Sequence, residues 1–216
     1  MNNLVSKHKK SRFSSPCFYV GAGLFVVALI AYLFFAHPFL AVTQRVDADV
    51  LVVEGWIPDY MLPPAATEFR QGKYSVFLVS GLQDDPKSNP ARSKSDAEQT
   101  ASRLEELGVP HSSLFPCPAP FASWMRTFKT AKAVRAKTIE LGLKPRGINV
   151  ITAGPHARET WVAYQHAFGE TMPVGIISIP KTNYPADRWW LTGQGWLWVS
   201  KDFIAWLKEV LIGQRA

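Results

Sequence analysis

The sequence predicts an α/β protein: a Rossmann-like three-layer α/β/α domain with a mostly parallel sheet, preceded by one transmembrane helix. Three observations predict this class. An apolar run with no charged side chain covers residues 18–36. After it, about five short apolar segments alternate with longer segments of helical pattern. The short segments are apolar along their whole length, which is typical of parallel strands that are buried on both faces.

The apolar run at 18–36 is long enough to cross a bilayer. Its nineteen residues extend roughly 28 Å as a helix, close to the hydrocarbon thickness of a membrane. Four basic residues precede the run and only Arg45 follows it closely, which places the N-terminus inside. We therefore expect a cytoplasmic basic tail at 1–16, a signal anchor in the lipid bilayer at 17–42, and an extracytoplasmic α/β domain at 46–216. The protein would then be a single-pass protein of the inner or plasma membrane, facing the periplasm.

Two other interpretations of the run remain open. A cleaved signal peptide has an apolar core of about 7–15 residues and small residues at its cleavage site, whereas this run is longer and is followed by His37 and Pro38. A helix of a soluble protein that is apolar on all sides would have to be enclosed by the rest of the fold. Cys17 lacks the preceding apolar residue typical of a lipoprotein cysteine.

Composition argues against several classes of function. The net charge of the 216-residue chain is +7, but the N-terminal tail supplies +4 of it. From Val46 onward there are 19 basic and 17 acidic residues, so we expect no nucleic-acid partner. Cys17 lies at the edge of the apolar run and Cys117 lies within the α/β domain, so we do not expect them to form a disulfide with each other. Because no Cys/His motif has the spacing of metal ligands, we also expect no metal site.

The first half of the domain alternates between strand and helix. A β-branched run within 47–56 predicts the first strand, and a helix at 65–74 follows two prolines that suit a first helical turn. The apolar segment 75–81 predicts the second strand. A polar loop then leads to a helix over 95–108, which opens with the Ser-x-x-Glu pattern of a capping box.

The second half continues the alternation. An extended stretch, a helix, a strand, a helix and a strand are predicted at 112–120, 121–142, 147–154, 155–169 and 174–180. Gly142 and Gly169 suit the ends of the two helices, and Pro155 suits the first position of the second. The remainder of the chain is aromatic and helical.

Tryptophan is concentrated near the C-terminus. Five of the eight tryptophans follow Pro185: Trp189, Trp190, Trp196, Trp198 and Trp206. Indole rings favour the membrane interface, so these residues suit a contact with the bilayer beside the anchor. The alternative is that they cover the last face of the sheet as part of the core.

Ligands of parallel α/β folds bind beyond the carboxyl ends of the strands, and small or polar residues occur at those positions here. The helix that starts at Pro155 offers free N–H groups and a positive dipole end, which suit a small anionic ligand. Candidate ligand-binding residues are Gly55, Ser80, Gly81, Arg126, Thr127, Thr152, Gly154 and Arg158. No cofactor is indicated by any motif.

The candidate catalytic residues are His156, Glu54 and Glu98. Histidine titrates near neutral pH and suits a general acid or base, and either carboxylate suits the orientation or activation of a water molecule. Each residue also has a structural interpretation. His156 suits a surface position in a first helical turn, Glu54 suits a loop contact, Glu98 completes the capping box, and Arg158 suits an ion pair.

In combination, the motifs DVLVVEGW, VFLVSG, SDAEQT, RTFKTA, ITAGPHARET and RWW resemble the YdcF-like family, a domain of unknown function shared with SanA and ElyC of bacterial envelopes. The resemblance covers about residues 48–192 and is strongest to a membrane-anchored branch. It implies a Rossmann-like fold with a ligand cleft at the strand ends, and a role in peptidoglycan or lipid-carrier metabolism.

The resemblance also bears on single residues. Ser80, Gly81, Glu98 and Thr127 match family positions, and His156 with Arg158 matches a family element with a shorter spacing. The residues 54–56 (Glu-Gly-Trp) stand where many relatives have two glycines, which alters the mouth of the cleft.

Two functions follow as hypotheses. The first is an envelope enzyme or binding protein for a phosphorylated, nucleotide-like or glycan-like small molecule. The second is a non-catalytic binding or regulatory module of envelope assembly.

Overall fold

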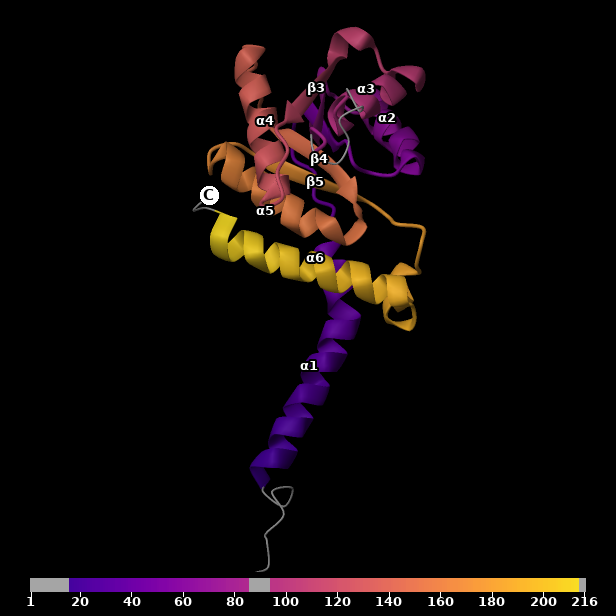
Figure 1. Cartoon of the computed structure of the whole chain (residues 1–216), viewed down its shortest axis with the longest axis vertical. Helices are drawn as coiled ribbons and strands as arrows, with labels where there is room; N and C mark the ends of the chain where they lie inside the picture. Colours follow the sequence, from indigo (N-terminus) through magenta and orange to yellow (C-terminus); the bar gives the residue numbers. More distant parts are fainter. Residues whose placement is uncertain (1–15, 86–93, 214–216) are drawn as a thin grey trace, which may run out of the picture.

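The computed structural model describes residues 16–85 and 94–213. The predicted cytoplasmic tail lies outside this range except for Pro16, and so does most of the polar loop before residue 95. The body that follows the first helix is built on a single five-stranded sheet (Figure 1).

The sheet is parallel throughout. Its strands are β1 (Val50–Glu54), β2 (Val76–Leu82), β3 (Leu114–Ala119), β4 (Ile148–Ala153) and β5 (Val174–Ile179). They lie in the order β3-β2-β1-β4-β5, and each neighbouring pair is parallel. Every residue of β1 and β4 is buried, as expected for central strands covered on both faces. The strand order reverses between β1 and β4, so a crevice is expected beyond the carboxyl ends of these strands.

Helices cover both faces of the sheet. On one face, α2 (Leu62–Gln71) and α3 (Asp96–Glu106) pack their apolar sides against Leu51, Val53 and the other strand residues of the first core. On the other face, α4 (Arg126–Glu140) and α5 (Ala157–Phe168) form a second core with Val50 and Val52. The predicted three-layer α/β/α fold is confirmed.

One predicted helix start differs from the structure, and another agrees with it. The helix expected at 121–142 begins at Arg126, because Met125 before it adopts a left-handed backbone with φ of 53°. The helix predicted around 65–74 begins at Leu62 and ends at Gln71, and the two prolines occupy its first turn as expected, where their missing N–H groups cost nothing.

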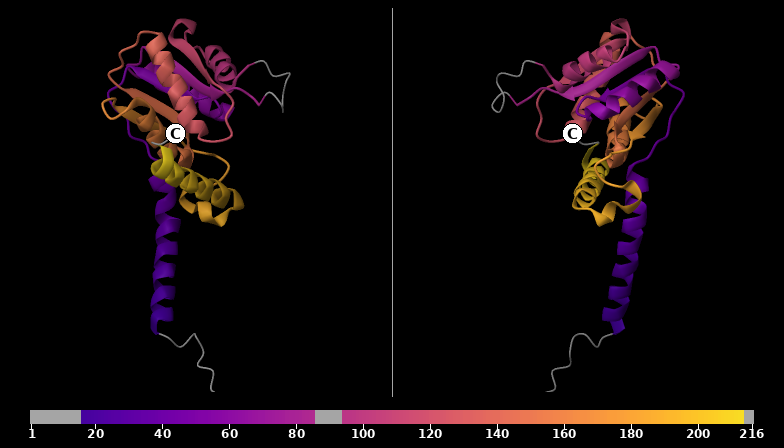
Figure 2. Two further views of the ribbon diagram at one scale, coloured as in Figure 1. Left: turned by 60° about the vertical axis from the view of Figure 1, so that its left-hand side comes forward. Right: turned by 90° about the vertical axis from the view of Figure 1, so that its right-hand side faces the viewer.

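The first helix, α1 (Pro16–Leu40), extends away from the body (Figure 2). Among the described residues it is the one helix that is long and apolar enough to cross a membrane, over Cys17–Leu40. Its exposed apolar side chains continue as far as Phe39. Its last turns, by contrast, pack against the body, because Ala36 and Leu40 are buried.

The last helix, α6 (Gly193–Ile212), lies across α1, between that helix and the sheet layers (Figure 1). The 3₁₀-helix η5 (Ala186–Leu191) precedes it. The predicted C-terminal tryptophans are on these two elements, and they pack against α1 instead of covering a sheet face. Trp189 is fully buried, and its indole N–H donates to the carbonyl of Leu33 at 3.1 Å.

Candidate functional site

A cleft of about 320 Å³ lies beyond the carboxyl ends of the central strands. Residues from β1, β2, α4, α5 and α6 contribute to its walls, together with the first residue of α3 and the last residue of the short helix before α5. The lining residues that bear on its chemistry are Glu54, Trp56, Ser80, Gly81, Asp96, Trp124, Arg126, Thr127, His156, Glu159, Lys201, Lys208 and Glu209. The cleft therefore lies where the strand order predicts a ligand site.

His156 stands in the wall of this cleft with carboxylates at both ring nitrogens. It ends the 3₁₀-helix η4 (Gly154–His156), which links β4 directly to α5. Its Nε2 atom lies 3.8 Å from Oε2 of Glu54. Its Nδ1 atom lies 3.1 Å from Oε2 of Glu159 and 3.5 Å from Oδ1 of Asp202. The imidazole is 13 % exposed, so these partners, and not bulk water, determine its charge.

The surroundings of His156 favour its protonated form. Burial alone would lower its pKa, but the negative charges of Glu159 and Glu54, together with hydrogen bonds to Asp202 and Glu159, raise the pKa well above the ordinary value of 6.5. These contacts therefore favour the imidazolium form of the ring at neutral pH. Such a ring can donate a proton or a charged hydrogen bond, and it is a poor proton acceptor until it has given up that proton.

Glu54 forms the floor of the cleft at the end of β1. Its carboxylate accepts hydrogen bonds from the hydroxyl groups of Thr152 and Thr160, the second at 3.2 Å. Burial raises its pKa, while the charge of His156 and the Thr152 hydrogen bond act in the opposite direction. The ring of Trp56 meets the His156 ring edge-on at 4.9 Å between centroids and closes one side of the pair.

Thr127 connects the start of α4 to the same network. Its hydroxyl donates to Oε1 of Glu159 at 3.3 Å and lies 3.5 Å from Nε2 of His156. The left-handed turn at Met125 directs the first turn of α4 toward the cleft, and Arg126 lines the cleft beside Thr127. Arg126 and Thr127, which were predicted to extend the site at the His156 turn, therefore line the same cleft as His156.

The helix α6 supplies the remaining wall. Lys201 and Lys208 line the cleft, and the ammonium of Lys208 lies 4.0 Å from the centroid of the Trp124 ring. Glu209 is buried beside them, with its Oε1 atom 3.1 Å from Nδ1 of His166. The cleft therefore has an acidic interior around one imidazolium and a basic rim formed by Arg126, Lys201 and Lys208. The helix start that was expected to hold a small anion therefore has carboxylates beside it.

The glycines at the strand ends serve packing as well as access. A side chain at Gly81 would overlap the backbone nitrogen of Ala97 and lie 2.9 Å from the carbonyl carbon of Asp96. One at Gly55 would lie 2.7 Å from the carbonyl oxygen of Ser80. These glycines let α3 approach β2 closely, while Ser80 and Gly81 also line the cleft.

Five predicted site residues do not line the cleft: Gly55, Glu98, Thr152, Gly154 and Arg158. Arg158 donates from Nε to the carbonyl of Phe39 at 2.9 Å and stacks on the Phe39 ring, so it faces α1. Glu98 completes the capping box with Ser95. Gly154 accepts a hydrogen bond from Ser178, and Thr152 lies beneath Glu54 as its donor. For Glu98, the structural interpretation describes the observed contacts. Within the described residues, Arg158 contacts Phe39 and not the carboxylate that its structural interpretation, an ion pair, requires.

Several residues of the site were not predicted. Glu159 lies three residues after His156, on the same helix face, so its spacing was a usable signal. Asp202, Lys201 and Lys208 come from a helix that the sequence pattern could not place beside the cleft. In the part of the chain that the structure describes, no group of three or more His, Cys, Asp or Glu side chains is arranged to hold a metal ion.

Comparisons with known proteins add no identification: no protein-family model matches the chain, and no curated protein matches it. The resemblance to the YdcF-like family therefore stays a prediction, and the site is interpreted from its own geometry.

Proposed function

We propose that this chain is a membrane-anchored envelope protein of the YdcF-like type, whose cleft binds a phosphorylated small molecule, nucleotide-like or glycan-like, with His156 as the proton donor. The observation that carries the proposal is the position of His156. Its imidazolium is buried in the wall of the cleft, below a rim of three cationic side chains.

The rim and the interior suit different parts of such a ligand. Arg126, Lys201 and Lys208 can hold phosphate oxygens by charge-assisted hydrogen bonds. The carboxylates of the interior repel a phosphate that enters too deeply, so the anion stays at the level of the imidazolium. Trp56 and Trp124 provide flat apolar surfaces beside it, suited to a base or a sugar ring.

The same arrangement supports hydrolysis of a phosphate ester or anhydride. As the bond from phosphorus to the leaving oxygen breaks, His156 gives its proton to that oxygen. The oxygen of a water molecule forms the new bond to phosphorus, and the proton that the water loses restores the imidazolium. Glu159 and Asp202 hold the ring in place throughout by their contacts with Nδ1.

The test is turnover by the full chain in detergent micelles, with phosphate release measured from a panel of nucleotides, sugar nucleotides and prenyl pyrophosphates. We expect His156→Gln to lower the rate about 100-fold or more, since a positioned acid contributes roughly 10²–10⁴. The matched control is His111→Gln, a histidine paired with Glu105 on the exposed surface, which should leave the rate unchanged. Equal rates in the wild type and His156→Gln would remove the catalytic role.

A binding or regulatory module is the second candidate function. Among the described residues, no serine or cysteine hydrogen-bonds to His156, and carboxylates contact both of its nitrogens. A ring held in this way also suits a fixed cation that binds an anion without reacting. Unmodified ligand retained in native mass spectra, with no turnover, would support this function. Arg126→Gln should then weaken binding, whereas Lys144→Gln, at an exposed position outside the cleft, should not.

The proposal places the α/β body outside the cell, since the basic residues precede α1 in the sequence. A reporter enzyme fused after Ala216 tests this directly. Alkaline phosphatase, which folds only in an oxidising compartment, should be active in the fusion. Activity of a cytosolic reporter at the same position would overturn the orientation.

A further inference from the structure

The helix α6 carries a stripe of apolar side chains that the rest of the protein leaves uncovered. Leu197, Ile204, Leu207 and Leu211 are between 41 % and 63 % exposed. They are separated by seven, three and four residues, so they share one face of the helix. We call these four residues the α6 stripe.

The α6 stripe lies between two features of the same helix. On one side is the contact with α1, where the hydroxyl groups of Tyr32 and Ser200 are 3.0 Å apart and the rings of Tyr32 and Phe203 pack edge-on at 5.6 Å. On the other side are Lys201 and Lys208, which line the cleft. The apolar stripe is therefore bordered by the end of α1 and by a row of positive charge.

The length of α1 indicates how close the apolar layer of a membrane would come to the body of the protein. From Pro16, where α1 begins, to Tyr32, where its contacts with α6 begin, the helix has seventeen residues. At the α-helical rise this segment extends about 24 Å, whereas the hydrocarbon core of a bilayer is about 30 Å thick. Over its described residues, α1 spans the full apolar layer only if the turns after Tyr32 also lie within that layer. Those are the turns against which η5 and α6 pack.

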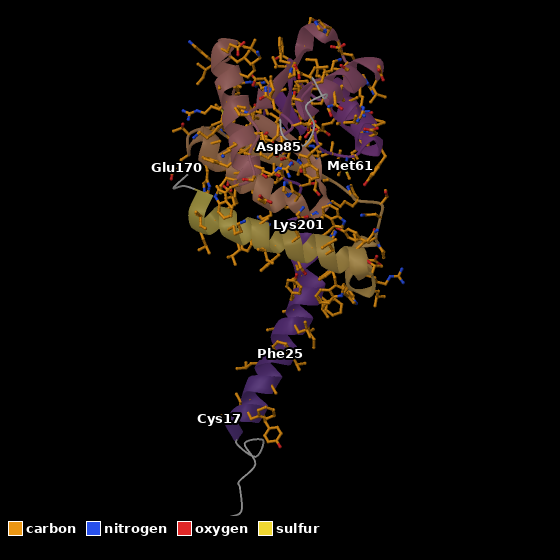
Figure 3. All side chains as sticks on the ribbon, viewed as in Figure 1. Cys17, Phe25, Met61, Asp85, Glu170 and Lys201 are labelled. Atoms are coloured by element: carbon orange, nitrogen blue, oxygen red, sulfur yellow. The ribbon has the colours of Figure 1, made fainter. Side chains whose placement is uncertain are left out.

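The orientation of α6 agrees with this depth. Figures 1 and 2 show α6 lying across the direction of α1, at the end of the body from which α1 leaves. In Figure 3, Phe25 lies on the part of α1 beyond the body, and Lys201 lies on α6 next to the sheet layers. A helix that crosses a membrane-spanning helix in this way lies near the plane of the bilayer.

We propose that the α6 stripe rests in the interface of the lipid bilayer that α1 crosses, so that α6 is an interfacial helix and seats the body on the membrane. This inference rests on the membrane anchor of the proposed function. Its chemistry is that of amphipathic surface helices, with leucine and isoleucine in the acyl boundary and lysines at the level of the lipid phosphates. The cleft, which α6 lines from its other side, is then about one helix diameter, roughly 10 Å, from the headgroups.

The experiment measures the depth of single labelled cysteines in the full-length protein, reconstituted in vesicles of phosphatidylcholine and phosphatidylglycerol. Cys17→Ser provides the background, because Cys17 is exposed and Cys117 is buried. A fluorescent probe is placed by Leu207→Cys or, as a second variant, Ile204→Cys. Phe25→Cys on α1 is the membrane-depth reference, and Ile139→Cys, 69 % exposed on α4, is the aqueous control.

Lipids brominated near the headgroup end of the acyl chain should quench the probe on the α6 stripe at least twofold more than the probe at residue 139. Aqueous iodide should quench the two probes in the opposite order. At residue 25, quenching should be strongest with lipids brominated deeper in the chain.

Each other outcome overturns a different claim. If residue 25 is quenched by lipid but residues 204 and 207 are quenched only by iodide, the anchor holds and the interfacial helix is wrong. If no site is quenched by lipid, the membrane anchor itself fails. If residues 204 and 207 are protected from both quenchers, a second copy or another protein covers the stripe, and the bilayer does not.

Discussion

The chemistry of the site depends on one buried imidazole that three separate elements surround with carboxylates. Glu54 comes from the end of β1, Glu159 from α5 and Asp202 from α6. A buried charge is tolerated only when it is paired, and the loss of one partner leaves the others uncompensated. His156 is therefore a structural link among these elements as well as a candidate proton donor.

The charge of His156 predicts a pH-dependent stability. Its pKa in the folded state is raised above the ordinary 6.5 by the neighbouring carboxylates, so its stabilisation is complete below pH 6.5 and is lost as the pH rises through the folded-state pKa. We expect His156→Gln to lower the free energy of unfolding by about 3 kcal/mol at pH 6, and by progressively less at higher pH. Thermal unfolding of the full chain in detergent from pH 6 to pH 10 measures this difference.

The control for this prediction is again His111→Gln, whose imidazole is 89 % exposed. It should leave the unfolding temperature nearly unchanged throughout the pH range. A difference between wild type and His156→Gln that stays constant, or grows with pH, would show that the folded-state pKa is not raised.

Among single residues, the sequence predicted the site residues that follow strands. It did not predict those that α6, far along the chain, contributes to the cleft. Glu54, Thr127 and His156 were identifiable because parallel strands and their helices meet at one edge of the sheet. Arg158 was misplaced because its side of α5 faces the end of α1, a contact between residues 119 positions apart. Asp202 had no local signal at all.

At the scale of elements, local rules account for most of what was predictable. The Ser-x-x-Glu pattern predicts the start of α3, and the structure confirms both hydrogen bonds of the capping box. Uniformly apolar strands predict a parallel sheet, which is also confirmed. The order β3-β2-β1-β4-β5 was beyond these rules, because the burial of each strand says how deep it lies and not which strands flank it.

The close approach of α3 to β2 gives a prediction about packing. Because a side chain at Gly81 would overlap backbone atoms of the first turn of α3, and backbone cannot move aside as a flexible side chain can, Gly81→Ala should cost about 2–3 kcal/mol. Gly193→Ala is the matched control, since nothing lies within 4 Å of its added carbon. Urea unfolding of both variants measures the difference, and an equal midpoint for the two would contradict the close packing.

At the scale of the whole molecule, a cluster rich in aromatic side chains joins the first helix, α1, to the last helix, α6. Its buried members are Ala36, Leu40, Tyr184, Trp189 and Val199. These residues come from opposite ends of the chain, so no local pattern could have paired them. Composition identified the tryptophan-rich C-terminal segment, but it did not show which residues of α1 that segment contacts. The consequence is that α1 is fixed to the body instead of connected by a loose linker.

Removing the central side chain of this cluster should therefore let α1 move relative to the body, while the sheet stays folded. Trp189 is fully buried, contacts Tyr32 edge-on at 5.6 Å and donates to Leu33, so Trp189→Ala should cost about 3–5 kcal/mol at this junction. Spin labels at Phe25→Cys and Ile139→Cys, in the Cys17→Ser background, report the distance between α1 and α4. We expect a narrow distance distribution in the parent, a broad one with Trp189→Ala, and no change with Leu191→Ala, whose side chain is exposed. A narrow distribution in all three would mean that other contacts suffice to orient the body on α1.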